Sequence, residues 1–348
     1  MQAYFGWQCI WCGYWSCSVN FIDSSLANYY NRASVGGLNI LMEKDQKNLG
    51  RALGINITDT AFHAVSVENG AEIVEKQVMS FDEGSDFIEQ LLSFVSSLKQ
   101  KNGGVSRLGI SVPGLVNHRT NRVEYSILFP EHSKVDIAAE IKANSGLDCL
   151  LMNDADAAAS GEFKLGAGRG ASDIFYATIG AGVGGSFILK GDIWQGVSGF
   201  AGEFGYMAIN SDGMRLEDVA SSRNIVRRTL NRFSQDGTSI LSKYDESEIT
   251  IADIVSAALQ EDDFAKLMLE RTGSYIGTAI ASVINLLNIE RIVIGGAVAD
   301  AGDLILGPII ERSKELSFGL SFSNTTIVAG ELGDKAAAIG AALYLSDK

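Results

Sequence analysis

The spacing of apolar and polar residues after residue 50 predicts alternating strands and helices. ALGINIT and AFHAVSVENGAEIVEKQVMSF have the pattern of a strand followed by a hairpin that turns at Asn69–Gly70. FDEGSDFIEQLLSFVSSLKQK has the spacing of an amphipathic helix, and RLGISV has that of a buried strand. This part of the chain is therefore expected to build one mixed sheet with helical cover.

The next segment predicts a strand that leads directly into a helix. HSKVDIAAEIKANSG is expected to be a helix that opens with Ser133 and Asp136 as a capping box and closes on Gly146. CLLMN predicts a strand with Asn153 and Asp154 at its carboxyl end, and ADAAASGEFKL continues as a helix. Asp154 is thus expected at a junction between strand and helix.

The second half of the chain repeats this order. DIFYATIG and GGSFILKGDIW predict another hairpin, ERIVIGG predicts a strand, and a final helix begins near Asp334. One apolar face marks a long helix before ERIVIGG, and its members are Ile276, Ile280, Val283, Ile284 and Leu287. The repeated order predicts an α/β protein with two lobes of similar plan that face each other across a cleft.

The first 49 residues have a different character. Cys9, Cys12 and Cys17 are interleaved with tryptophans, and they supply three of the four ligands that a zinc site needs. The alternative is an unpacked leader, since Met42 stands just before the domain boundary. The segment SLANYYNRASVGGLNILMEK is faintly like a helix-turn-helix, but two glycines inside its second helix would cost about 1 kcal/mol each. We expect the leader.

Composition narrows the partners and the compartment. The 348 residues carry a formal net charge of −14, which does not favour contact with nucleic acid. No apolar run reaches the roughly 18–20 residues of a membrane span, and the opening stretch lacks the basic region of a signal peptide. Cys149 is the one cysteine after residue 17, as expected for a reducing compartment. We therefore expect a cytoplasmic protein with no membrane association.

Two segments have the composition of a phosphate site and of a catalytic junction. The run IGAGVGG, from Ile179 to Gly185, contains glycines that allow backbone N–H groups to approach phosphate oxygens, although such a run also suits a simple hairpin turn. Asp154 is placed to act as a general base toward a hydroxyl, and an N-cap of the following helix is the structural alternative.

Two further acids are candidates for the same cleft. Glu203 stands among small residues in GFAGEFG, a setting suited to hydrogen bonds from sugar hydroxyls. Glu217 opens the EDVASS helix, where an acid is also favoured by the helix dipole alone.

Taken together, these segments resemble the ROK family of sugar kinases and sugar-responsive repressors. The resemblance covers about residues 52–345 and rests on SVPGLV, NDADAAASGEFKLGAGRG, IGAGVGG with GVSGFAGEFGYM, RIVIGGAV and ELGDKAAAIGAAL. It implies a two-lobed, actin-like (ribonuclease H-like) sugar kinase fold and a homodimer. A small lobe is expected from residues 50–154 plus 335–348, and a large lobe from 155–334.

The resemblance also implies roles for individual residues. Asp154 would take the proton from the sugar hydroxyl that attacks the γ-phosphate of ATP, with Mg²⁺ neutralising charge. The residues expected to bind the sugar are Asn153, Glu203, Glu217 and Gly114. The residues expected to border the nucleotide are Gly180, Gly182, Gly184, Thr60, Gly295 and Gly296.

The chain departs from the family pattern at both sides of the cleft. The Asp-x-Gly-Gly-Thr turn of the kinases is replaced by Asn56 to Thr60, in which Asp59 would face phosphate with like charge. Tyr206 stands where the family has a histidine, and the zinc-binding cysteine loop is missing, so no zinc site is expected. Leu128 aligns with a sugar-contacting asparagine. ATP binding is therefore expected to suffer.

Three functions follow from this balance. The first is a sugar-sensing, regulator-type effector domain with a degraded ATP site, which the spoiled phosphate turn favours. The second is an ATP-dependent hexose or amino-sugar kinase, which Asp154 and the glycine-rich run favour. A structural or oligomerisation remnant is the third.

Overall fold

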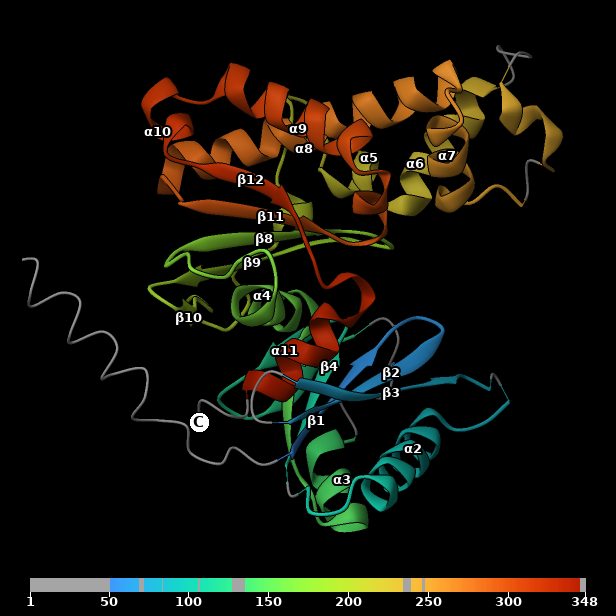
Figure 1. The fold of residues 1–348 in the computed structure, drawn as a ribbon, viewed down its shortest axis with the longest axis vertical. Helices are drawn as coiled ribbons and strands as arrows, with labels where there is room; N and C mark the ends of the chain where they lie inside the picture. The colour runs from blue at the N-terminus through green and yellow to red at the C-terminus, as the bar shows by residue number, and fades with distance from the viewer. Residues whose placement is uncertain are drawn as a thin grey trace, which may run out of the picture. The chain divides into compact units, whose positions relative to one another are not determined.

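A computed structural model describes the part of the chain that carries these motifs. The described residues are 51–68, 72–82, 84–105, 107–126, 135–233, 239–245 and 248–344. The expectations for the first 49 residues, for the turn at Asn69–Gly70 and for Leu128 lie outside them. Within the described residues the fold is mixed α/β, with two five-stranded sheets and helices around both (Figure 1).

The first sheet joins an antiparallel hairpin to parallel strands. In spatial order its strands are β3 (Glu72–Ser80), β2 (Ala61–Glu68), β1 (Arg51–Ile57), β4 (Arg107–Val112) and β7 (Asp148–Asn153). β1 pairs antiparallel with β2 and parallel with β4, so the predicted strands RLGISV and CLLMN are confirmed. The carboxyl ends of β1, β4 and β7 consequently share one edge of the sheet.

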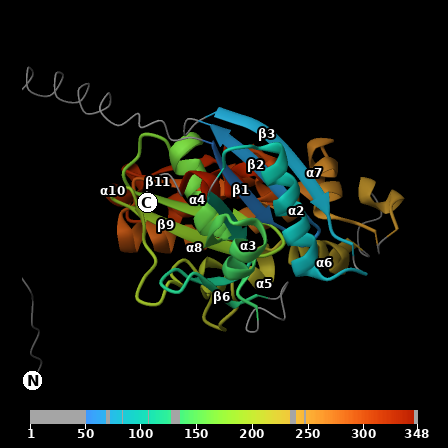
Figure 2. The same cartoon turned by 90° about the horizontal axis from the view of Figure 1, so that it is seen from below.

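Helices cover both faces of this sheet, as the alternation of side chains along its strands requires. Leu53, Ile55 and Ile57 of β1 pack with α2 (Phe87–Lys101) and α3 (Ile137–Ser145). The opposite face of the sheet packs against α11 (Ala336–Tyr344). Figure 2 shows α2 and α3 together over β1 and β2.

The predicted capping box of α3 is wrong in its register. Asp136 is itself the N-cap, and its side chain accepts a hydrogen bond from the Ala139 amide. Ser133, expected to open the helix, lies outside the described residues. The predicted end at Gly146 is confirmed, with a left-handed φ of 71°.

The second sheet repeats the topology of the first. In spatial order its strands are β10 (Asp192–Ile193), β9 (Val183–Leu189), β8 (Ile174–Ile179), β11 (Arg291–Gly295) and β12 (Thr326–Ala329). β8 pairs antiparallel with β9 and parallel with β11, just as β1 pairs with β2 and β4. The predicted duplication of hairpin, strand and helix is thus confirmed.

The outer face of the second sheet carries the larger helical layer. The helices of this part are α5 (Glu217–Ala220), α6 (Ser222–Phe233), α7 (Ile251–Leu259), α8 (Asp263–Leu287), α9 (Asp303–Leu316) and α10 (Gly319–Ser323). The apolar face expected on α8 is buried except at Leu287, the last helical residue, which is 45% exposed. No helix among the described residues combines the length and apolar character that a membrane span requires.

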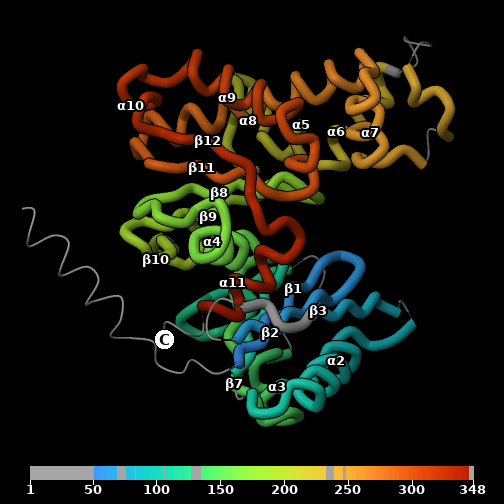
Figure 3. Tube along the Cα trace, viewed as in Figure 1, coloured from blue at the N-terminus to red at the C-terminus, as the bar shows by residue number. Residues whose placement is uncertain are grey.

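Two helices lie between the sheets, and Figure 3 follows the chain from one to the other. α4 (Asp154–Leu165) packs against β8 and β9, and α11 packs against the first sheet. The two helices meet at small residues. A Cβ on Gly340 would stand 1.7 Å from the carbonyl oxygen of Ala157, and one on Gly161 would stand 2.3 Å from that of Ala336. Their backbones are therefore in contact, as few helix pairs are.

A buried acid fixes the far end of α4. Glu162 is 1% exposed, and its carboxylate accepts hydrogen bonds from the amides of Ala167, Glu331 and Leu332. The last two amides belong to the segment that leads from β12 into α11. α4 and this connection are therefore held as one unit. The lobe boundaries expected at residues 154 and 335 fall at the starts of these helices and remain a prediction.

Candidate functional site

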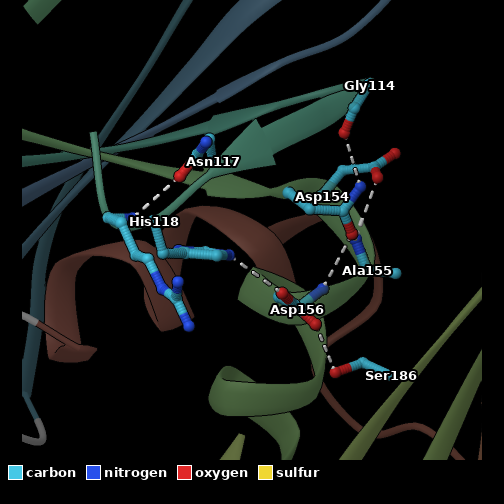
Figure 4. Close-up of polar contacts among 9 residues, drawn as sticks. Gly114, Asn117, His118, Asp154, Ala155, Asp156 and Ser186 are labelled. Carbon is cyan, nitrogen blue, oxygen red and sulfur yellow. Dashed lines mark hydrogen bonds and ion pairs between the residues drawn. The ribbon is translucent and has the colours of Figure 1, made fainter. Parts of the chain in front are cut away.

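Asp154 is the first residue of α4 and is delivered by the end of β7 (Figure 4). Asn153 is the N-cap, since its Oδ1 accepts from the amides of Ala155 at 2.9 Å and Asp156 at 3.2 Å. The alternative that Asp154 merely caps this helix is therefore wrong. Asp154 Oδ1 also accepts a hydrogen bond from the Ala155 amide, at 2.9 Å. Its Oδ2 receives no hydrogen bond from the described residues. That oxygen is available to a ligand.

The Asn153 side chain also holds the glycine turn that follows β4. Its Nδ2 donates to the carbonyl oxygen of Gly114 at 2.8 Å. Gly114 has a φ of 141°, and a Cβ there would stand 2.2 Å from the carbonyl oxygen of Tyr125. A glycine is therefore required by backbone approach. Sugar contacts by Asn153 and Gly114 stay predictions, and the Asn153 oxygen is already used in the cap.

Of the three predicted acids, Glu203 is within electrostatic reach of both Asp154 and Glu217. Burial, with the nearby charges of Asp156 and Glu203, raises the pKa of Asp154 to about 6. Burial and the charge of Glu217 raise the pKa of Glu203. A carboxylate with a pKa near 6 is charged at neutral pH yet is a better proton acceptor than an ordinary aspartate. The group is chemically suited to polarise or deprotonate a hydroxyl.

A glycine brings Glu203 to this cluster. Gly202 has a φ of 97°, and a Cβ there would stand 2.2 Å from the carbonyl oxygen of Gly185. The loop that precedes Glu203 therefore crosses β9 with backbone touching backbone. The small residues of GFAGEFG are thus needed for position as well as for access.

Glu217 connects the acids to the β8–β9 turn, residues 179–183, which we call the second turn. Its Oε2 accepts from the Val183 amide at 3.0 Å. Within the turn the Gly180 amide donates to Gly182, and the Gly180 carbonyl accepts from Ser222. The amides of Ala181 and Gly182 have no acceptor among the described residues. Of the predicted glycine cradle, these two N–H groups remain for an anion.

The other predicted nucleotide glycines lie beside the second turn. Gly296 has a φ of 86°, and a Cβ there would stand 2.5 Å from the carbonyl oxygen of Ile179. Gly295 leaves room for the Tyr176 hydroxyl, and Gly184 leaves room for Thr178 and Ala155. The structure brings these three glycines to one end of the second sheet, and their contact with a nucleotide stays a prediction.

The β1–β2 turn, residues 58–61, is the counterpart in the first sheet, and we call it the first turn. Thr58 Oγ1 accepts from the Ala61 amide at 3.1 Å and, over a longer 3.4 Å, from the Thr60 amide. The Thr58 amide and hydroxyl both donate to the Ala61 carbonyl. Among the described residues only the Asp59 amide of this turn lacks an acceptor. Sequence reasoning identified the lost glycines here but missed the Thr58 cap, which the known habit of threonine in turns would suggest.

Sequence reasoning also missed a buried polar chain beside Asp154. His118 Nε2 lies 3.5 Å from Asp156 Oδ2, and the Ser186 hydroxyl donates to Asp156 Oδ1 at 2.6 Å (Figure 4). The His118 and Asp156 side chains are each 8% exposed. The chain links the turn after β5 (Leu115–Asn117) to α4 and β9. The repeated acid in NDAD is the one sequence signal that points to it.

A short hairpin stands where the family has its zinc loop. The Arg215 guanidinium lies 4.3 Å from the centre of the Tyr206 ring, and Ala208 bridges to Arg215. Within the described residues no three His, Cys, Asp or Glu side chains are grouped to hold a metal ion. The absence of zinc remains an expectation.

Comparison with known sequences gives one family. The ROK family pattern matches residues 52–348. A glucokinase of Halalkalibacterium halodurans is 29% identical over 311 residues, covering 83% of this chain and 92% of the relative. A xylose repressor of Caldicellulosiruptor bescii is 26% identical over 336 residues, covering 90% of this chain and 83% of the relative.

Solved structures of both functional kinds share the fold. A ROK family transcriptional regulator, a homolog of the E. coli MLC protein, has a TM-score of 0.75 at 29% identity and covers 85% of this chain and 78% of its own. A ROK family glucokinase from Streptomyces griseus, in complex with glucose and AMPPNP, has a TM-score of 0.73 at 26% identity. The match covers 84% of this chain and 98% of the glucokinase chain. The two-lobed actin-like fold is thereby established, and this regulator and this kinase match the chain with similar identity and TM-score.

Proposed function

The chain belongs to the ROK family, and from that premise we propose that it is a sugar-sensing effector of the regulator type with a reduced capacity for ATP. The alternative within the family is an ATP-dependent hexose or amino-sugar kinase. We further propose a cytoplasmic homodimer. The net charge of −14 does not favour direct contact between this chain and DNA.

The observation that carries the proposal is the cap that Thr58 makes in the first turn. A turn binds phosphate through backbone N–H groups that point at the anion without a competing acceptor. The Thr58 hydroxyl occupies the amides of Ala61 and, more weakly, Thr60. The Asp59 carboxylate adds like charge at the same place. A phosphate would have to displace the cap and meet that charge.

The sugar side of the cleft supports the binding half of the proposal. Asp154 keeps a carboxylate oxygen without a partner among the described residues, the charge of Glu203 acts on Asp154, and the charge of Glu217 acts on Glu203. Carboxylates accept hydrogen bonds from hydroxyl pairs, which is the chemistry that a neutral aldose offers. The matched relatives named for glucose and xylose point to the same ligand class.

The kinase alternative has its own supporting observation. With a pKa of about 6, Asp154 is ionised at neutral pH and suited to accept a hydroxyl proton. The Ala181 and Gly182 amides of the second turn would hold phosphate oxygens, and bound Mg²⁺ would supply charge neutralisation. Asp154 would orient the sugar hydroxyl and take its proton.

A paired binding and turnover experiment decides between the two. Thermal unfolding is measured with glucose, xylose, mannose and N-acetylmannosamine, with and without MgATP, while ADP release is followed in the same samples. We expect at least one sugar to stabilise the protein, by about 2.7 kcal/mol at 100 times its Kd, without ADP release. Sugar-dependent ADP release that disappears in Asp154→Asn would establish the kinase instead. No stabilisation by any sugar would contradict both.

A further inference from the structure

A cavity of about 490 Å³ lies outside the acid cluster and takes no part in the function proposed above. One wall is the hairpin of β5 and β6 (Arg122–Tyr125), and the other is the loop that contains Val197 and Phe200. Its volume is within the roughly 300–1,000 Å³ of small-molecule sites. It is therefore large enough for a sugar ring with bound water.

The cavity adjoins the proposed sugar site along both of its walls. Leu115 in its lining follows Gly114, and Phe200 stands three residues before Glu203. The two walls meet closely, because a Cβ on Gly199 would stand 3.4 Å from the carbonyl oxygen of Val116. Both walls therefore lead, within three residues along the chain, from the sugar-binding candidates to the cavity.

The hairpin wall presents a preformed polar row. Asn117 Nδ2 donates to Glu124 Oε1 at 3.0 Å, and Asn117 Oδ1 accepts from the Arg119 amide at 3.0 Å. The Arg119 guanidinium and the second Glu124 oxygen make no ion pair or hydrogen bond with the described residues. The Asn117–Glu124 pair is thus held in place, and the Arg119 guanidinium and one Glu124 oxygen are left to bind neighbouring hydroxyls.

Apolar side chains face the same space. Tyr125 is 53% exposed and Val197 is 91% exposed, and both line the cavity with Phe200. Exposed aromatic and aliphatic groups beside fixed polar groups are typical of ligand sites. A pyranose has the matching chemistry, because its C–H face is apolar and its rim carries hydroxyls. Arg119 and Glu124 together balance in charge, which favours a neutral ring over an anion.

The hairpin wall also contacts α4 from behind. His118, between Asn117 and Arg119, is 8% exposed and lies against Asp156 of α4. A buried contact at this point limits movement of the polar row. Binding groups that are fixed before the ligand arrives lose less entropy on binding.

We propose that this cavity is a second saccharide subsite, so that the ligand is a disaccharide or longer glycoside rather than a free monosaccharide. One sugar unit lies at Asp154 and Glu203, and the next ring packs on Tyr125 and Phe200. Arg119 and the Asn117–Glu124 pair bind the hydroxyls of that second ring. The inference rests on the proposed sugar function and extends its ligand class.

Calorimetric titration of the full chain tests the subsite. Kd values are measured for glucose and xylose and for maltose, cellobiose, sucrose and xylobiose. We expect at least one disaccharide to bind about tenfold more tightly than its monosaccharide, which corresponds to about 1.4 kcal/mol. Arg119→Ala and Tyr125→Ala are each expected to bring this ratio close to one. Monosaccharide binding in the same variants reports that they are folded.

Two variants control for unspecific effects. Arg122→Ala removes an exposed arginine of the same hairpin that is outside the cavity lining, and its ratio is expected to match the wild type. Tyr125→Phe keeps the aromatic face and is expected to keep most of the preference. Equal or weaker binding of every disaccharide, or a preference that survives both alanine substitutions, overturns the subsite while leaving the sugar function intact. Failure of every saccharide to bind contradicts the proposed function itself.

Discussion

The first and second turns occupy equivalent positions in two sheets of the same topology, but their backbone amides have different hydrogen-bond acceptors. In the first turn the Thr58 hydroxyl accepts hydrogen bonds from two of the turn's own amides. One amide of this turn is left without an acceptor among the described residues. The second turn is bound by residues outside it, since Glu217 accepts from the Val183 amide and Ser222 donates to the Gly180 carbonyl. Two amides of this turn have no acceptor among the described residues. A duplicated topology therefore does not guarantee a duplicated binding capacity, because two or three side chains decide where the N–H groups go.

The same comparison separates the proposed sugar site from the proposed nucleotide site. Glu217 belongs to the acid cluster and also accepts a hydrogen bond from the Val183 amide. The second turn is therefore connected to the proposed sugar site. Thr58 has hydrogen bonds within its own turn only, among the described residues. Sugar binding is thus expected to depend on the second turn and to be indifferent to the first.

The largest expected effect comes from removing the contact between Glu217 and the second turn. Glu217→Ala removes a carboxylate from the cluster and an acceptor from Val183, and hydrogen bonds to charged groups contribute about 1.5–3 kcal/mol each. We expect sugar affinity to fall about 10- to 100-fold in a calorimetric titration. Thr58→Ala is the matched change in the first turn and is expected to leave sugar affinity within about twofold. Equal losses in both variants would contradict the comparison.

The next effect is a pH dependence that Asp154 imposes on stability. Its folded pKa of about 6 lies above the ordinary aspartate pKa of 3.8, so between these pH values the folded protein holds a proton that the unfolded chain releases. Stability is therefore lost as pH rises from about 4 to about 6, by about 2 kcal/mol. Asp154→Asn removes this loss, and denaturant unfolding of both proteins at pH 4.5 and pH 7 measures it. Parallel pH profiles would show that Asp154 titrates normally.

The smallest expected effect comes from substitutions that make the first turn resemble the second. Thr58→Gly combined with Asp59→Gly frees the capped amides and removes the repelling carboxylate. We expect the affinity for AMPPNP to rise about tenfold, since one hydrogen bond to a charged group is worth about that much. The single variant Asp59→Gly is the control, because it removes the charge and leaves the Thr58 cap in place. Unchanged affinity in the double variant would mean that another feature limits nucleotide binding.

The sequence is sufficient to predict the duplicated fold and the position of Asp154. Both follow from local periodicity, since each hairpin and each helix shows its own spacing, and Asp154 lies directly between a strand and a helix. The Thr58 cap is local too, but a four-residue turn can adopt many other hydrogen-bond arrangements. The contact of His118 with Asp156 joins residues that are far apart in the chain, and it depends on how β5 sits against α4. The cavity beside Tyr125 likewise arises from two distant loops.

The backbone contact between α4 and α11 has a mechanical consequence. With 12 residues, α4 is about 18 Å long. Glu162 anchors one end to the connection that enters α11, and Asp154 forms the other end. Gly161 and Gly340 leave no side chain to cushion a change in the crossing angle. A change in the crossing angle would therefore drive one backbone into the other, so α4 and α11 are expected to move as one rigid unit that carries the Asp154 carboxylate with it.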